Sequence, residues 1–381
     1  MITYHIGLNA HLLSRQSGYR RAGIHGYIAN LLACLPDADP DLRYTAFVGS
    51  GDPPPHPRMA VRRTHLPTAH PLARIVWEQL AQPWQLGGLD LLHALAFVSP
   101  LLGRRPTVVT VYDLSFLRYP ERLPPARRLY LRLFTGLSCR RARRVIAISR
   151  STADDLTALL GVPRLLIDVA QPGVSPDFRP LPTDVVAAFR ARHGLPERFF
   201  LHLGTLEPRK NLPMLLEGYA QLPAATRRAA PLILVGGQGW DGGATQAAIA
   251  RLGLDDCTRL AGYAPDADLP LWYNAATALV CPSVYEGWGL PVVEAMACGT
   301  PVLVSDTSSL PEAAGDAGLR LPPDDPTAWA GGLRRALEDV DWRAEAVALG
   351  HRHAATFTWI ETARATVRSY RRALATVETM A

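Results

Sequence analysis

Apolar and polar positions alternate along the chain in a way that is typical of parallel α/β domains. Short apolar, often β-branched runs predict buried strands, and the longer amphipathic patterns between them predict helices. In the first half, strands are predicted at residues 3–8, 44–48, 107–114, 144–149 and 166–170, and helices at 23–35, 125–142 and 151–160. In the second half, strands are predicted at residues 199–204, 231–237, 257–263, 278–283 and 301–306, and helices at 211–222, 243–253, 266–275 and 291–298. Residues 342–381 are predicted to be helical throughout.

A proline-rich segment, QPGVSPDFRPLPTD at residues 171–184, divides this pattern into two halves. Four of its fourteen residues are proline, which favours a linker over a helix or a strand. Because 381 residues are too many for one ordinary hydrophobic core, the segment is expected to join two domains. Ligands of doubly wound domains bind at the carboxyl ends of the strands, so the loops that follow the strands are the expected functional positions.

The composition, with 48% hydrophobic and 19% charged residues, is that of a folded protein. The five cysteines form no CxxC pair, so neither a disulfide framework nor a zinc site is predicted, and a cytoplasmic location is expected. No signal peptide is expected, and the longest apolar passage, residues 89–102, is too short to cross a membrane. DxD patterns at residues 37–39 and 266–268 are interpreted as surface turns, and no metal site is predicted.

Positive charge is concentrated in one segment of the first half. The formal net charge is only +6, but the stretch from Arg118 to Arg150 contains ten arginines and a single acidic residue, Glu121. Residues 126–144 within it carry leucines at helical spacing. Two interpretations stay open: a solvated basic face of a docked helix, or a surface for anionic lipid or a phosphate-bearing substrate. Nucleic-acid binding is not indicated, because stacking aromatic residues are not interleaved with the arginines.

The segment GTLEPRKNLP, residues 204–213, contains Lys210, the only lysine among the 40 basic residues of the chain. It follows a predicted strand, and Asn211 is placed to cap a helix that has Pro213 in its first turn. Arg209 and Lys210 would then lie at a helix amino terminus, where free N–H groups and the helix dipole favour an anion. Two cations stabilise such a helix poorly, but they suit a bound phosphate or diphosphate. The alternative is a pair of solvated loop cations.

The segment PSVYEGWGLPVVEAMACGT, residues 282–300, places two carboxylates around a second predicted helix start. Pro291 is expected to open this helix, and Gly289 has no side-chain oxygen to cap it, so the first N–H groups are left for a ligand. Glu286 lies in the loop and Glu294 is expected in the first helical turn, so both can face one cleft. In the alternative interpretation, Glu294 only complements the helix dipole and Glu286 is solvated.

Together these two segments resemble the paired motifs of the retaining glycosyltransferases of family four, a mannosyltransferase-like branch of the group 1 glycosyltransferases. EGWGLPVVE is similar to the Glu-x7-Glu motif of the family, and LGTLEPRKN, about 77 residues earlier, is similar to its Arg-Lys diphosphate loop. The resemblance extends over essentially the whole chain and includes SGYRRAGIHGYIANLL, PTVVTVYDL, VIAISRSTADDL, PGVSPDF and the helices after FTW.

The resemblance implies the GT-B fold, in which two Rossmann-like, doubly wound parallel-sheet domains face a central cleft. Residues 1–175 would form the acceptor-side domain, and residues 176–357 would form the nucleotide-sugar-binding domain. The last helix, residues 358–381, would cross back onto the first domain.

The resemblance also implies an activity and a role for each motif residue. A hexose, with mannose favoured, would pass from a nucleoside-diphosphate sugar such as GDP-mannose to an acceptor hydroxyl, with retention of configuration and without a metal or other cofactor. Arg209 and Lys210 would neutralise the departing diphosphate, Glu286 would hold hydroxyls of the donor sugar, and Glu294 would hold those of the ribose. Further donor contacts are implied for Gly23, Gly204, Gly287, Trp288, Gly289, Leu290 and Tyr263.

The implied acceptor is a saccharide or a lipid-linked precursor in surface-polysaccharide or glycolipid synthesis. It would be met at the inner membrane face, which would give the basic segment Arg118–Arg150 a purpose as a peripheral contact with anionic membrane. Two departures from the family pattern fall in the first domain. Tyr112 and Asp113, expected to contact sugar or acceptor, stand where relatives often have His-Asp, and His25 stands where relatives tend to have glycine.

Two other functions stay open. GQGWDG, residues 237–242, matches the dinucleotide-binding pattern G-x-G-x-x-G and would suit an NAD(P)-dependent dehydrogenase. However, the next predicted strand ends without the acidic residue that would bind a ribose. A non-catalytic nucleotide-binding protein would keep the same fold and lose turnover.

Overall fold

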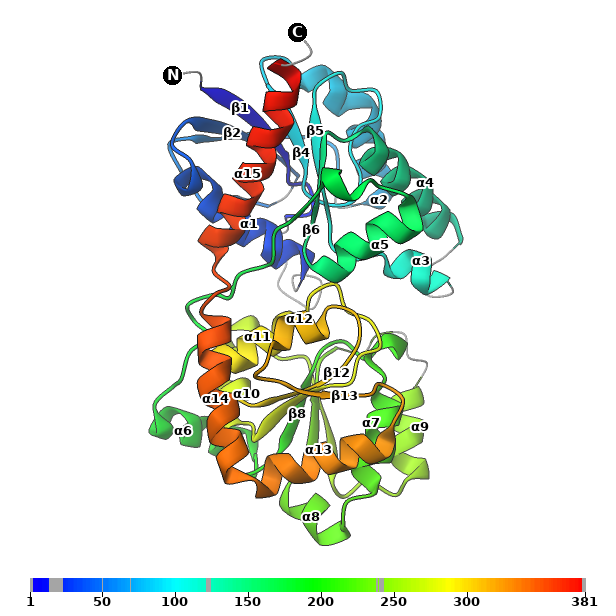
Figure 1. Cartoon of the computed structure of the whole chain (residues 1–381), viewed down its shortest axis with the longest axis vertical. Coiled ribbons are helices and arrows are strands. Elements are labelled where there is room, and N and C mark those ends of the chain that lie inside the picture. Colours follow the sequence, from blue (N-terminus) through cyan, green and yellow to red (C-terminus); the bar gives the residue numbers. More distant parts are fainter. Residues whose placement is uncertain are drawn as a thin grey trace. The chain divides into compact units, whose positions relative to one another are not determined.

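The computed structural model describes residues 3–13, 23–49, 51–68, 70–120, 125–237, 239 and 243–378. The chain divides into two compact units (Figure 1): unit 1 comprises Met1–Gly173 and Thr358–Ala381, and unit 2 comprises Val174–Phe357. Each unit is built on a parallel sheet with helices packed against it, which confirms the two doubly wound α/β domains predicted from the sequence.

The sheet of unit 1 has seven strands in the order β3-β2-β1-β4-β5-β6-β7, and all neighbouring strands are parallel. The strands are β1 Tyr4–Asn9, β2 Leu42–Val48, β3 Met59–Arg63, β4 Leu91–Ala94, β5 Thr107–Val111, β6 Arg144–Ala147 and β7 Ile167–Val169. The chain runs outward in one direction from β1 and in the other from β4. The gap between the carboxyl ends of these two strands is therefore the topological switch point, where doubly wound sheets bind ligands.

The helices of unit 1 are α1 Ile24–Ala38, α2 Pro71–Val76, α3 Ser115–Arg118, α4 Pro125–Arg141, α5 Arg150–Leu160 and α15 Trp359–Glu378. Directly after α2 the helical path continues through a π-helical turn, η2 Trp77–Ala81, and a 3-10 turn, η3 Gln82–Gln85. A short 3-10 turn, η5 Arg164–Leu166, precedes β7.

The last helix, α15, lies on the sheet of unit 1 although it follows unit 2 in the chain. It packs against α1 and against β5, β6 and β7. The hydroxyl of Tyr370 lies 2.6 Å from Nδ1 of His93 on β4, and Arg371 pairs with Asp39 at 2.7 Å. These contacts join residues that are more than 270 positions apart, so α15 is an integral part of the unit 1 core.

The sheet of unit 2 has six strands in the order β10-β9-β8-β11-β12-β13, again all parallel. The strands are β8 Phe200–Leu203, β9 Leu232–Val235, β10 Thr258–Gly262, β11 Ala278–Cys281, β12 Val302–Ser305 and β13 Leu319–Leu321. The helices are α6 Thr183–His193, α7 Leu212–Ala220, α8 Ala224–Ala229, α9 Ala244–Arg251, α10 Leu269–Ala275, α11 Leu290–Ala297, α12 Leu310–Ala314, α13 Pro326–Glu338 and α14 Val340–Ala354, with 3-10 turns η6 Pro208–Lys210 and η7 Asp266–Asp268. The topological switch point of this sheet lies between β8 and β11.

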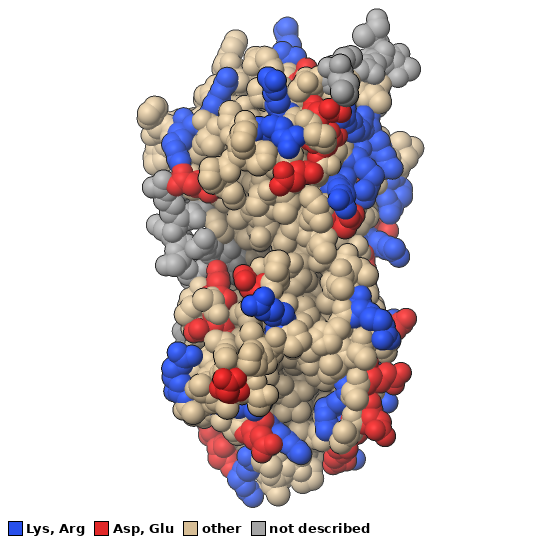
Figure 2. Space-filling view, turned by 90° about the vertical axis from the view of Figure 1, so that its left-hand side faces the viewer, with Lys and Arg blue, Asp and Glu red and all other residues tan. Residues whose placement is uncertain are grey.

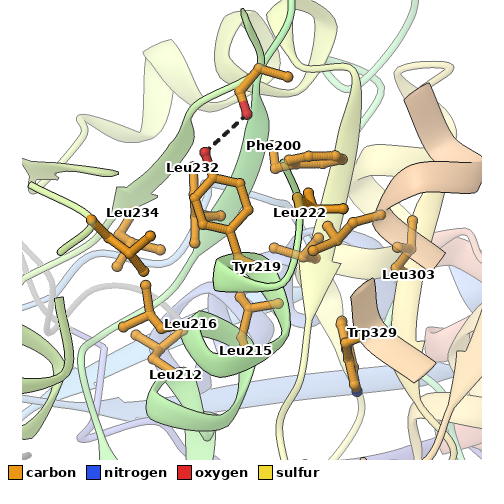
Figure 3. Close-up of a cluster of buried hydrophobic side chains, with 14 of the residues drawn as sticks. Phe200, Leu212, Leu215, Leu216, Tyr219, Leu222, Leu232, Leu234, Leu303 and Trp329 are labelled. Carbon is orange, nitrogen blue, oxygen red and sulfur yellow. Dashed lines mark hydrogen bonds between the residues drawn. The ribbon is translucent and has the colours of Figure 1, made fainter. Parts of the chain in front are cut away.

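A hydrophobic core packs against β8 (Figure 3). Phe200 on β8 packs edge-on against Tyr219 on α7, and the same buried cluster includes Trp329 on α13 and the leucines of α7 and β9. The buried Tyr219 hydroxyl lies within hydrogen-bond distance of the carbonyls of Arg227 in α8 and of Ala230 directly after it, so its polar atom is satisfied inside the core. This rigid base fixes the strand end from which the candidate site begins.

The sequence missed several elements and misjudged one. Strands β3, β4 and β13, helices α3, α6, α8, α12 and α13, and the helical segment 71–85 were not predicted. The tail was predicted to be one continuous helical region, but this is wrong, because α14 ends at Ala354 and α15 begins at Trp359.

Candidate active site

The basic doublet lies just after β8, at the switch point of unit 2. Gly204 follows the strand with φ at +154°, and a Cβ placed there would come within 3.3 Å of both Cε and Nζ of Lys210. Glycine therefore lets the lysine side chain lie against the backbone. Arg209 and Lys210 themselves form the end of the 3-10 turn η6, directly before α7.

The predicted capping of α7 by the Asn211 side chain is wrong. Asn211 has a left-handed backbone with φ at +57°, and its side chain makes no capping hydrogen bond to α7. Instead, its Nδ2 donates to the carbonyl of Pro323 at 2.6 Å. The left-handed turn directs this side chain to a neighbouring loop, and Pro213 is left to open the helix.

The second motif follows β11, the strand beside β8. Gly289 precedes α11 with φ at +112° and supplies no side-chain cap, as the sequence predicted, and Pro291 lies in the first turn. Glu294 lies in the second turn of α11 rather than the first, because the helix begins at Leu290. Its carboxylate is therefore not a simple complement to the helix dipole, which acts within the first turn.

Glu286 and the basic doublet meet in one ion-pair cluster. The Glu286 Oε1 accepts hydrogen bonds from Lys210 Nζ at 2.6 Å and from Ser283 Oγ at 2.8 Å. The other oxygen, Oε2, accepts from Arg209 Nη1 at 2.6 Å. Lys210 and Glu286 are both buried. The predicted convergence of the two motifs at one place is thus present for Glu286, Arg209 and Lys210.

Backbone hydrogen bonds hold the two loops of this cluster together. The N–H of Val284 donates to the carbonyl of Arg209 at 2.9 Å, which joins the loop after β11 to the turn after β8. On the other side, Ser308 Oγ accepts from the N–H of Glu286 at 3.0 Å, and Ser309 Oγ donates to the carbonyl of Glu286 at 2.9 Å. Glu286 is therefore held by hydrogen bonds to both its main chain and its side chain.

The charges of the cluster balance within the protein. Glu207 accepts from Arg209 Nε at 2.8 Å, so two carboxylates face two cations. Burial alone would raise the pKa of Glu286, but Arg209 and Lys210 outweigh it and hold that pKa well below its usual range. The sequence had indicated that these cations need an external anion, and the structure shows that Glu207 and Glu286 already compensate them.

Glu294 occupies a different environment on α11. Its Oε2 accepts a hydrogen bond from the hydroxyl of the buried Tyr273 on α10 at 2.8 Å. Burial raises the pKa of Glu294 to about 7, with Tyr273 opposing the shift and Asp266 adding to it. A carboxyl group with this pKa can both donate and accept hydrogen bonds near neutral pH.

The remaining residues of unit 2 that were predicted to contact the donor differ in which of their atoms are accessible. The Trp288 ring is buried and packs edge-on against Phe357 with ring centroids 5.0 Å apart, so only its backbone is available in the loop. Gly287, Gly289 and Leu290 are the loop residues that lead into α11. Tyr263 follows β10 and is 44% exposed.

The predicted contacts of unit 1 lie in its core or at helix starts. Gly23 precedes α1 with φ at +75° and has open space where a Cβ would stand. The Tyr112 hydroxyl donates to the carbonyl of Leu95 at 2.7 Å inside the core. Asp113 accepts from the N–H of Ser115 at 2.8 Å at the start of α3, and His25 is buried in α1.

His202 on β8 is a site residue that sequence reasoning missed. Its Nδ1 lies 3.1 Å from the carbonyl of Val280, so Nδ1 must donate and Nε2 must carry a lone pair. Burial, and then the nearby charge of Lys210, lowers the pKa of His202 to about 4, so the ring is neutral. The Cβ position at Gly204 is 3.7 Å from this Nε2 and 3.3 Å from Lys210 Nζ, which places the neutral ring beside the ammonium group.

A second feature that sequence reasoning missed is an apolar stripe on the helical segment 71–85. Leu72, Val76, Leu80 and Trp84 are four residues apart and all exposed, with Trp84 90% exposed. The leucines of α4, Leu129, Leu133 and Leu137, are also exposed, and arginines surround them. The loop at Ser99 joins the two elements, because it accepts from Gln79 and donates its N–H to Ser138 of α4. The four-residue spacing is visible in the sequence and could have revealed the stripe.

On the face of the molecule drawn in Figure 2, basic side chains gather over part of unit 1 and mix with acidic ones over unit 2. Among the helices that the structure describes, none has both the length and the apolar character needed to cross a bilayer.

Family models and known relatives identify the class of protein. The model described as glycosyl transferases group 1 matches residues 187–350, and the model described as glycosyltransferase family 4 matches residues 21–178. The O-antigen chain mannosyltransferase B of Escherichia coli is 36% identical over 265 residues, which are 69% of this chain and 70% of that protein. The D-inositol 3-phosphate glycosyltransferase of Streptomyces bingchenggensis is 32% identical over 303 residues, which are 76% of this chain and 65% of that protein.

Solved structures agree on the fold. Sucrose-phosphate synthase from Thermosynechococcus elongatus superposes with a TM-score of 0.77 at 22% identity and covers 98% of this chain and 100% of that one. Anabaena HepE in complex with UDP and glucose gives a TM-score of 0.73 at 20% identity, covering 97% and 99% of the two chains. The chain belongs to the group 1 glycosyltransferases of family four and has the GT-B fold, as the sequence motifs indicated.

Family membership also decides against the dehydrogenase alternative. Four residues of the GQGWDG loop, Gln238 and residues 240–242, lie outside the described residues, so its structure carries no argument. Strand β10 ends at Gly262 without an acidic residue, as the sequence showed.

Proposed function

We propose that this glycosyltransferase moves a hexose, with mannose favoured, from a nucleoside-diphosphate sugar such as GDP-mannose to a saccharide or lipid-linked acceptor. The reaction retains the anomeric configuration and uses cationic side chains rather than a metal. The observation that carries the proposal is the ion-pair cluster of Arg209, Lys210 and Glu286 at the switch point between β8 and β11. The names of the mannosyltransferase relatives favour mannose and a role in polysaccharide synthesis.

In this proposal the cluster stabilises the leaving group. The bond between the anomeric carbon and the diphosphate breaks, and the acceptor oxygen bonds to the same carbon from the same face. The acceptor proton is taken up by the departing diphosphate. Negative charge grows on the diphosphate in the transition state, so fixed cations beside it lower the barrier. Lys210 has three N–H groups, and Glu286 Oε1 accepts from one, so the same ammonium can also bind a phosphate oxygen.

The other residues would orient the donor. Glu286 would accept from hydroxyls of the donor sugar while it holds the two cations in place. Glu294, with one oxygen on Tyr273, would bind the ribose with the other. The amino terminus of α11, which has no side-chain cap, would contribute backbone N–H groups to the phosphates or the sugar. Gly23 would allow close approach of the ligand at the start of α1.

A nucleotide panel tests the donor part of the proposal. GDP is expected to raise the melting temperature of the protein more than UDP, ADP, CDP or dTDP, because the proposed donor is GDP-mannose. A ligand at 100 times its Kd stabilises the folded protein by about 2.7 kcal/mol. With GDP-mannose, release of GDP only in the presence of acceptor would exclude a non-catalytic nucleotide-binding protein. Failure of all five diphosphates to stabilise the protein would contradict the proposal.

We further propose that the stripe of Leu72, Val76, Leu80 and Trp84, together with the exposed face of α4, contacts an anionic membrane surface. Exposed leucines and a tryptophan beside a cluster of arginines suit the interface of a bilayer that carries negative lipids. Such a contact would bring the enzyme to a lipid-linked acceptor.

Vesicle sedimentation tests this surface. The protein is expected to bind phosphatidylcholine vesicles that contain phosphatidylglycerol, and to be released by added salt, because screening weakens charge attraction. Trp84→Ala should reduce binding severalfold, whereas Leu165→Ala, which removes a leucine that is 75% exposed elsewhere on unit 1, should not. Equal binding by Trp84→Ala and wild type, or binding that ignores salt, would count against the proposal.

A further inference from the structure

Two serines after β12 bind the main chain of the loop that carries Glu286. We call residues 286–289 the donor loop, because the proposed function assigns them to the donor. The Ser309 Oγ lies 2.9 Å from the carbonyl oxygen of Glu286 and 2.8 Å from that of Trp288, and Ser309 is fully buried. The Ser308 Oγ accepts from the N–H of Glu286 at 3.0 Å. Strand β12 lies beside β11 in the sheet, so the serines and the donor loop follow neighbouring strand ends.

Ser309 does not cap the helix that it precedes. It is the N-cap residue of α12, a position where a serine side chain usually accepts a hydrogen bond from the first helical turn. Its side chain makes no such bond, and its O–H donates to the donor loop instead. Helix α12 therefore starts without a side-chain cap, and the hydroxyl that could have supplied the cap holds the donor loop.

Ser308 has a strained backbone. Its φ is +53°, in the left-handed region that residues other than glycine seldom adopt. Among the described residues, only Phe97, Asn211 and Ser308 combine a side chain with a positive φ, and Asn211 directly follows Lys210. Residues in strained conformations cluster at functional sites. Glycine would adopt this φ without strain, so the contribution that is specific to serine here is its hydroxyl.

The two serines fix the direction of backbone groups in the donor loop. A trans peptide is planar, and its C=O and N–H point in opposite directions. The hydrogen bond from Ser309 to the carbonyl of Trp288 therefore turns the N–H of Gly289 away from Ser309. Gly289 also packs closely on α12, where a Cβ would come within 3.1 Å of Leu310 Cδ2. The bonds at Glu286 hold the main chain from which its carboxylate reaches the two cations.

We propose that Ser308 and Ser309 are positioning residues that clamp the donor loop, so that the Glu286 carboxylate and the Gly289 N–H face the donor sugar in one fixed arrangement. The proposal deepens the glycosyltransferase function proposed above and rests on it. Ser309 is shut off from solvent and acts only through the loop. Without the clamp, the cations after β8 would still bind the diphosphate, but the loop would no longer hold the sugar.

Calorimetry with GDP-mannose and GDP tests the proposal, because the two ligands differ only by the sugar. Ser309→Ala should bind GDP-mannose about tenfold more weakly than wild type and GDP within about threefold, because hydrogen-bonding groups of the loop no longer have a fixed direction toward the sugar. Ser308→Gly should show the same selective loss. Since glycine relieves the strained φ, this variant should melt within a few degrees of wild type, and it decides the question alone if Ser309→Ala does not fold.

Ser305→Ala is the matched control. Ser305 is as buried as Ser309 and lies four residues earlier, but its hydroxyl has no hydrogen-bond partner among the described residues, so the variant should bind both ligands like wild type. An unchanged affinity of the two clamp variants for GDP-mannose would overturn the proposal. An equal loss for GDP-mannose and GDP would show a purely structural role and would overturn it as well. In both cases wild type binds the nucleotide and only this inference fails, whereas a wild type that binds neither ligand contradicts the proposed function and this inference with it.

Discussion

Replacing Lys210 by methionine is expected to lower the rate of sugar transfer by about 100- to 1,000-fold, the usual cost of removing a group that stabilises transition-state charge. Methionine keeps most of the length of the side chain and removes the ammonium group that donates to Glu286 at 2.6 Å. Arg209 and Ser283 still pair with Glu286, so the free energy of unfolding should fall by only about 1–3 kcal/mol. Release of the nucleoside diphosphate measures the rate, and chemical denaturation measures the stability.

An exposed ion pair provides the control for this substitution. Arg251→Met breaks the 2.8 Å pair with Glu217, in which both side chains are largely exposed, and should change the stability by less than about 1 kcal/mol with full activity. If Lys210→Met retained wild-type transfer, Lys210 would have no part in stabilising the leaving group. If both variants lost activity equally, the effect would not be specific to the cluster.

The substitution Glu286→Gln is expected to separate binding from turnover. It leaves two adjacent cations with only Glu207 as a counter-charge, so nucleoside diphosphate should bind more tightly than to wild type. Transfer should nevertheless fall by about 100-fold or more, because the amide no longer fixes the cations or accepts fully from the donor sugar. Breaking a buried pair should also lower the stability by about 3–5 kcal/mol. Calorimetry with GDP and denaturation measure these two effects, with Glu217→Gln as the exposed control.

The same carboxylate predicts a dependence of stability on pH. Because the pKa of Glu286 is lower in the folded protein than in the unfolded chain, its pairing contributes stability at all pH values above the unfolded pKa, about 4.5. That contribution is lost progressively as the pH falls below this value. Wild type should therefore lose stability more steeply than Glu286→Gln on acidification. Weaker GDP binding by Glu286→Gln, or identical acid profiles of the two proteins, would contradict this description of the cluster.

The fold was predictable where burial is uniform along a strand. Strands β9 and β11 of unit 2 are continuous apolar runs, because helices cover both faces of a parallel sheet, and both were predicted correctly, as was β8, which is apolar except for His202. Strand β4 was missed; it has only four residues, and its His93 is paired inside the core with Thr110 and Tyr370, 17 and 277 residues away, which no local pattern shows. The segment 71–85 was missed although Leu72, Val76, Leu80 and Trp84 recur every four residues; this spacing continues through a π-helical turn and departs from the 3.6-residue period of an α-helix.

The site was predictable to the extent that its motifs are local. Glycine and proline positions around residues 204–213 and 282–300 marked where strands end and helices begin, which placed Glu286 near the basic doublet. The pairing of Lys210 with Glu286, and of Glu294 with Tyr273, depends on which strands are neighbours in the sheet. No local sequence pattern contains that information. From the sequence, the two cations were therefore expected either to bind a ligand or to be solvated, and their pairing with Glu207 and Glu286 was not predicted.

The most direct test of the central claim, that the cluster at β8 and β11 binds the diphosphate of the donor, uses the fact that Lys210 is the only lysine of the chain. Reductive methylation followed by mass spectrometry therefore reports on two amines alone, Lys210 and the amino terminus, and the second is an internal control. Saturating GDP is expected to slow methylation of Lys210 at least about tenfold and to leave the amino terminus unaffected. Methylation of Lys210 at the same rate with and without bound GDP would show that the diphosphate lies elsewhere.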